Sequence, residues 1–86
     1  MKNLMKSYNN ILAEAVKCDL EGNHRDATYL FGEAHGMLHM AYIMYDTIGS
    51  ETVAKMSRAS ELAYDIVMGE VADEQESIWI LENNMA

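Results

Sequence analysis

Two histidines four residues apart, His35 and His39, are the side chains of this sequence best placed to hold a metal ion. On a helix this spacing puts both imidazoles on one face, about one turn apart, where zinc could bridge them. Glu61 or Asp65 could add a third ligand from a neighbouring helix. Because no HExxH glutamate, cysteine cluster or second histidine pair accompanies them, we expect hydrogen-bonded histidines at a helix or subunit boundary and no cofactor. Zinc binding by the pair is the alternative.

Three carboxylates near the C-terminus, Asp73, Glu74 and Glu76, could serve as a general acid and base. Catalysis would need a pocket that separates their pKa values, and the neighbouring sequence supplies none. The single cysteine, Cys18, has no partner for a disulfide, and we expect it to be a small buried apolar residue. No glycine-rich phosphate loop or recognisable Ser-His-Asp arrangement is present. The sequence therefore indicates no enzymatic activity.

Charge is distributed unevenly along the chain, whose net charge is −8. Residues 1–58 carry six basic and seven acidic side chains, whereas residues 59–86 carry seven acidic side chains and no lysine or arginine. Such a surface would repel a phosphate backbone and attract a basic protein surface. We therefore expect no direct nucleic-acid binding and a protein partner with a basic surface.

Trp79 lies among these acids, next to Ile78, Ile80 and Leu81. Such an aromatic residue either covers the core or anchors a partner, because aromatic residues inside a charged rim are frequent binding hot spots. We favour the anchor within an acidic partner-binding surface. Its predicted members are Glu61, Asp65, Glu70, Asp73, Glu74, Glu76 and Trp79.

Apolar residues recur at helical spacing through most of the chain, with turn signals at Gly22-Asn23, Gly49-Ser50 and Gly69. Ser50 is a candidate N-cap, and Asp73 with Glu76 resembles a capping box. The pattern predicts a single all-α domain over 1–86, a three-helix bundle with a short fourth C-terminal helix. The expected helices span about 3–21, 25–48, 51–68 and 74–83.

The second expected helix is apolar on nearly all sides between Met37 and Tyr45, which predicts that it is enclosed as the central helix. Met37, Met40 and Met44 are accordingly expected in the core, in preference to an adaptable binding groove. An alternating series along the same helix predicts a packing seam of coiled-coil type. Its members are Ala27, Phe31, Ala34, Leu38, Ala41, Tyr45 and Ile48.

Gly32 and Gly36 stand one turn apart in this helix, where each costs about 1 kcal/mol relative to alanine. Close approach of another helix would offset this cost. The helix could belong to the same chain or to a second copy, and both alternatives stay open. A homo-oligomer would use Gly32, Gly36, His39 and Ile43, and a chain of this size often gains buried area by self-association.

Neither a secretory signal nor an apolar run long enough to span a membrane is apparent. We therefore expect a cytoplasmic protein that does not bind membranes.

Residues 22–34 resemble the helical hairpin of tetratricopeptide-type repeats and of MIT domains. The resemblance rests on Gly22, Asn23, Ala27, Phe31 and Ala34, with Ala15 on the preceding helix, while His24 replaces the usual tyrosine and no proline ends the second helix. It implies a scaffold that binds peptides or helices without catalysis.

We therefore expect a non-catalytic protein-interaction module. It resembles the small acidic inhibitors that phages and mobile elements direct against host nucleic-acid enzymes, in which carboxylates stand in for phosphates. A further alternative is an oligomeric sponge for a small charged ligand, which would need Lys6, Lys17 and Arg25 to converge.

Overall fold

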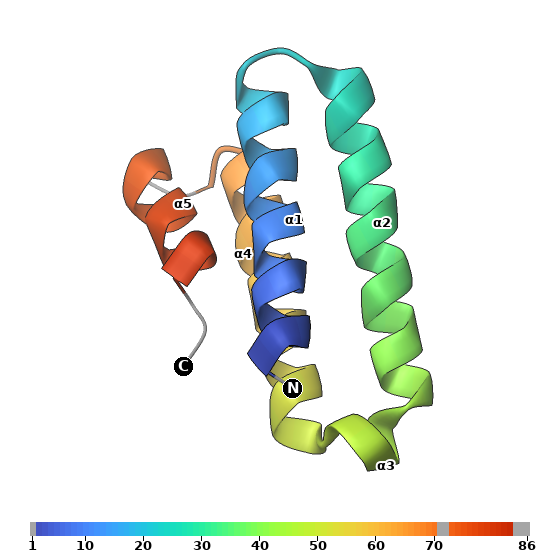
Figure 1. Cartoon of the computed structure of the whole chain (residues 1–86). Coiled ribbons are helices and arrows are strands. Elements are labelled where there is room, and N and C mark those ends of the chain that lie inside the picture. Colours follow the sequence, from blue (N-terminus) through green and yellow to red (C-terminus); the bar gives the residue numbers. More distant parts are fainter. Residues whose placement is uncertain (1, 71–72, 84–86) are drawn as a thin grey trace.

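The computed structural model describes residues 2–70 and 73–83, and this part of the chain forms five helices and no strand. The all-α class predicted from the sequence is confirmed. Three helices are long and two are short (Figure 1). They are α1 (Lys2–Leu20), α2 (His24–Ile43), α3 (Tyr45–Ile48), α4 (Ser50–Val67) and α5 (Glu74–Asn83).

The first helix, α1, occupies the middle of the molecule and contacts α2, α4 and α5 (Figure 1). In this view α2 lies to one side of α1 and α5 to the other. The prediction that the second helix is central is therefore wrong. Helical periodicity shows that a helix is apolar on several sides, but the positions of its neighbours decide which sides are covered.

The core is built from the apolar stripe of α1 and the facing stripe of α4. Tyr8, Leu12 and Val16 of α1 are almost completely buried, as are Met56 and Ile66 of α4. Small residues fill the space where the helices approach closely, since an alanine lets two helix backbones come near each other. These include Ala13, Ala15, Ala59 and Ala63.

Helix α2 packs on α1 through a row of buried alanines, Ala27, Ala34 and Ala41. These three members of the predicted seam are confirmed, whereas Phe31 and Leu38 are half-buried. The aromatic ring of Phe31 stacks on that of Tyr64 in α4, with 5.4 Å between ring centroids. Helix α2 therefore covers the core with one face and leaves its opposite face exposed.

Glycines with positive φ angles follow α1, α3 and α4, where the turn signals predict reversals of the chain. Gly22 (φ +86°) reverses the chain after α1, and the amide of Asn23 donates a 2.8 Å hydrogen bond to the carbonyl of Cys18. The Asn23 side chain then accepts a hydrogen bond from the amide of Asp26 and caps α2. The first hairpin is thus fixed by local interactions.

The second predicted helix does not run unbroken to Ile48. Helix α2 ends at Ile43, and Met44 (φ −96°, ψ 25°), whose amide still donates to the carbonyl of Met40, makes a bend before α3. The sequence carries no glycine or proline at this bend, so it gave no local signal for it. Gly49, not Ser50, occupies the N-cap position of α4, and the predicted Ser50 cap is wrong because Ser50 is already the first helical residue.

Candidate functional site

The start of α5 is fixed by Asp73, which holds the helix through three hydrogen bonds. Its carboxylate accepts from the amide of Glu76 at 3.0 Å, and its carbonyl accepts from the amide and the hydroxyl of Ser77 at 3.1 and 2.9 Å. The aspartate cap predicted from the sequence is confirmed. Asp73 therefore has a structural role in addition to its charge.

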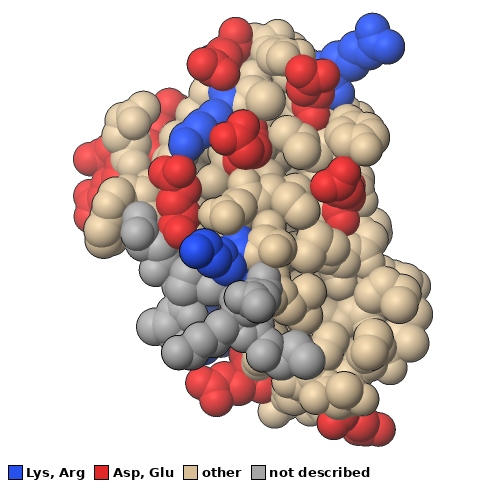
Figure 2. All heavy atoms as spheres, viewed as in Figure 1, with Lys and Arg blue, Asp and Glu red and all other residues tan. Residues whose placement is uncertain are grey.

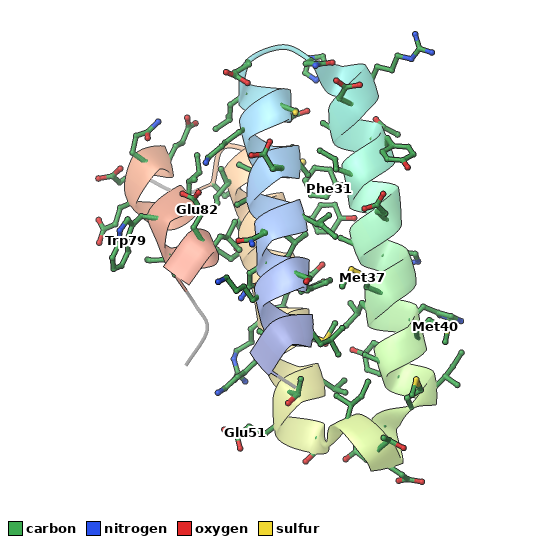
Figure 3. All side chains as sticks on the ribbon, in the orientation of Figure 1. Phe31, Met37, Met40, Glu51, Trp79 and Glu82 are labelled. Atoms are coloured by element: carbon green, nitrogen blue, oxygen red, sulfur yellow. The ribbon has the colours of Figure 1, made fainter. Side chains whose placement is uncertain are left out.

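One face of α5 packs on the rest of the molecule and the other points into solvent. Ile78 and Leu81 are buried on the side of α1 and α4, with Leu81 completely inaccessible. Trp79 is 63% exposed and Ile80 is exposed beside it. Figure 3 shows the Trp79 side chain pointing away from α1 on the outer side of α5. Of the two interpretations of Trp79, exposure favours the anchor over the cover of the core.

The exposed end of α5 is strongly acidic. Glu74 and Glu76 are exposed in its first turn, and Glu76 lies three residues before Trp79, which places the two side chains on the same side of the helix. Figure 2 shows carboxylates gathered over this helix. An exposed indole and carboxylates therefore share one surface.

Glu82, at the other end of α5, is engaged within the chain. Its carboxylate lies 2.8 Å from the Lys17 Nζ atom of α1, and both side chains are about 40% exposed. The hydrogen bond to Glu82 raises the pKa of Lys17. Because the pair is partly solvated, it adds at most about 1 kcal/mol to stability. Glu82 thus helps to hold α5 on α1, and it is the carboxylate partner of Lys17.

The remaining predicted acids lie on or after α4. Glu61 and Asp65 are exposed one turn apart, and Glu70 follows the helix, its amide donating a 2.9 Å hydrogen bond to the carbonyl of Asp65. Arg58, three residues before Glu61, is the last lysine or arginine of the sequence. The predicted acidic residues are therefore all exposed, but they are divided among α4, α5 and the segment between these helices.

The two histidines, His35 and His39, are exposed on α2. Among the residues that the structure describes, no group of three His, Cys, Asp or Glu side chains is arranged to hold a metal ion. The expectation that Glu61 or Asp65 completes the site is therefore not met. The third histidine, His24, lies at the start of α2 with its Nδ1 atom 2.8 Å from Asp19.

Cys18 is only partly buried, so its predicted place in the core is wrong. Burial raises the pKa of its thiol, and nearby Asp26, Glu14 and Glu21 raise it further. A thiol held in its neutral form is a poor nucleophile.

An apolar groove lies between α1, α2 and α3, where core packing of the methionines is the favoured prediction and an adaptable binding groove the alternative. It has a volume of about 610 Å³ and is lined by Leu4, Gly36, Met37, Met40, Ala41, Met44 and Ile48. Met40 and Met44 are exposed, so their predicted burial in the core is wrong. The sequence signal for the groove is the apolar surface on all sides of α2. This pattern predicts that neighbouring helices enclose α2, but in the structure one apolar side lines the groove.

The described part of the chain is thus a small helical protein with two distinct surfaces, an acidic one around Trp79 and an apolar one on α2. None of its helices combines the length and apolar character needed to cross a membrane. Comparisons with protein-family models, curated proteins and solved structures give no match to this chain.

Proposed function

We propose that this chain is a non-catalytic protein-binding module whose acidic C-terminal surface binds a basic surface of a partner protein. The observation that carries the proposal is the exposed Trp79 on the same side of α5 as the carboxylate of Glu76, with Glu74 also exposed in the first turn of this helix. An aromatic side chain that becomes buried on binding supplies much of the free energy of association. Surrounding carboxylates steer a basic partner toward it and select against acidic ones.

Support for a scaffold role comes from how α5 is held. The Asp73 cap holds the first turn of α5, and the pair between Lys17 and Glu82 links this helix to α1, so that the exposed side chains are presented by an ordered element. In this proposal the three long helices act as a bundle that carries the binding surface. The resemblance of residues 22–34 to tetratricopeptide-type and MIT hairpins is consistent with such a scaffold.

The partner class follows from the charge. Carboxylates spaced along α4 and α5 can occupy sites that normally bind phosphates, and we propose a cytoplasmic enzyme that acts on nucleic acid as the target, in the manner of phage-type inhibitors. Binding would then block the substrate site of the partner without any reaction on this chain.

The test uses Trp79, which is the chain's single tryptophan, as the reporter. The full chain is titrated with a synthetic amphipathic helical peptide of leucine and arginine, and with the same peptide carrying glutamate in place of arginine. We expect a saturable shift of Trp79 emission to shorter wavelength with the arginine peptide alone. The shift reports burial of the indole on binding.

The decisive variant is Glu74→Lys with Glu76→Lys, which leaves the Asp73 cap in place. Its matched control, Glu33→Lys with Glu51→Lys, makes the same change in net charge at exposed positions on α2 and at the start of α4. We expect affinity to fall about tenfold or more, which corresponds to about 1.4 kcal/mol, in the first variant and only slightly in the second. Equal losses in both variants, or unchanged Trp79 emission, would refute the proposed surface.

A further inference from the structure

The outer face of α2 is not covered by any of the residues that the structure describes. A Cβ atom added at Gly32 or Gly36 would meet no atom within 4 Å. On the same helix Tyr29, Ile43 and Met40 are 70%, 66% and 52% exposed. The alternative that the glycines permit packing within the chain is therefore wrong. Among the described residues, no contact offsets the cost of the two glycines to helix stability.

This face combines large side chains with a flat strip of backbone. Gly32 and Gly36 lie one turn apart near its middle, Tyr29 precedes them, and Met40 and Ile43 follow them. If two such helices run antiparallel about a two-fold axis near Gly36, residues equally far before and after Gly36 lie opposite each other. Tyr29 then faces Ile43 of the second copy, and Gly32 provides space for its Met40.

Charge favours the antiparallel direction. Arg25 is exposed at the beginning of α2 and Asp46 is exposed just after its end. An antiparallel pair brings Arg25 of each copy near Asp46 of the other, and it also opposes the two helix dipoles. A parallel pair would instead place Arg25 near Arg25 and Asp46 near Asp46.

The position of α2 also allows self-association in a chain with a net charge of −8. Helices α2 and α5 lie on opposite sides of α1, and neutral residues cover most of the lower right of Figure 2, over the C-terminal half of α2. Two copies joined through α2 would keep their acidic α5 surfaces far apart. The apolar groove adjoins this face, since Gly36 and Met40 line it, and it extends the contact toward Leu4.

We propose that the outer face of α2 is a homodimer interface, in which two copies pack α2 against α2 in antiparallel directions about a two-fold axis near Gly36. The dimer presents two acidic surfaces that point away from each other. It can therefore engage two basic sites at once, although the dimer itself does not depend on the proposed function.

Sedimentation velocity of the full chain at about 5–500 µM tests the interface across the range of weak to moderate dimers. We expect twice the 9.7 kDa chain mass at high concentration. Ile43→Glu should weaken association at least tenfold, because it buries a charge against the second copy's Tyr29. The matched control is Met68→Glu, which makes the same change at a 72% exposed position after α4 and should leave the mass unchanged.

A charge exchange tests the direction of packing. Arg25→Asp and Asp46→Arg should each weaken the dimer, and the double variant should restore it, since only the antiparallel pair brings these two positions together. A chain that stays monomeric at all concentrations overturns the proposal, as does a dimer unaffected by Ile43→Glu or a double variant without rescue. If the chain is a monomer and binds the leucine and arginine peptide through Ile43, the outer face of α2 binds a helix of another protein. That result would also overturn the homodimer proposal.

Discussion

Replacing Gly32 and Gly36 by alanine should stabilise the monomer, although the two glycines lie in the middle of a helix. Both positions have helical backbone, and the added Cβ atoms meet nothing within 4 Å. The change therefore supplies helix propensity without a steric cost. The expected gain is about 1 kcal/mol at each position and about 2 kcal/mol for the double variant. For a chain of this length that corresponds to a rise in melting temperature of roughly 10 °C.

Gly22→Ala is the matched control for this prediction. Its added Cβ atom also meets nothing within 4 Å, but its φ of +86° is unfavourable for any residue with a side chain. The same chemical change should therefore destabilise the chain by about 1 kcal/mol. Because the added Cβ atom has open space at all three positions, a difference in stability between these variants reports the effect of backbone conformation and not of packing.

Urea and thermal unfolding followed by circular dichroism, at concentrations where the chain is monomeric, measure these differences. The double variant should gain stability under these conditions and lose self-association at high concentration, because two methyl groups would then separate the paired helices. A double variant that is less stable than the parent as a monomer would refute the assignment of an open face on α2.

Two further predictions concern residues buried in the core, one the packing of Leu81 and the other the ionisation of Tyr8. Leu81→Ala should lower the free energy of unfolding by about 3 kcal/mol, because Leu81 is fully buried where α5 docks. Ile80→Ala, at a half-exposed position of the same helix, should lower it by less than about 1 kcal/mol. Urea titrations measure both differences, and equal losses would contradict this docking of α5. Burial raises the pKa of Tyr8 above 10.0, against the opposing effect of its hydrogen bond to Ser60. The unfolded chain therefore loses this proton first, so the contribution of Tyr8 to stability is complete below about pH 10 and is lost as the pH rises through the folded-state pKa. Tyr8→Phe should reduce the alkaline loss of stability in unfolding curves measured between about pH 8 and 11, and an unchanged pH dependence would contradict the assignment to Tyr8.

The ends of α1 and α4 and the start of α5 could be predicted from the sequence because they depend on local chemistry. Gly22 and Gly69 adopt the positive φ angles that end α1 and α4, and Asp73 caps α5 within hydrogen-bonding distance of its own first turn. Each of these interactions joins residues a few positions apart, so the sequence already contains both partners. The acidic character of residues 59–86 could also be predicted from the sequence, because a segment with seven acids and no lysine or arginine stays acidic wherever it folds.

The covered and open faces of α2 were decided only by the tertiary structure. Its alanines and its methionines both fit a core, and periodicity alone assigned Met40 and Met44 to the interior. Helix α1 takes the central position and contacts α2 on the side of its buried alanines. It leaves open the outer face of α2, with Gly32 and Gly36, and the apolar groove lined by methionines. Periodicity records how apolar residues are spaced around one helix, whereas exposure depends on how many neighbours the other helices provide, which is a property of the whole chain.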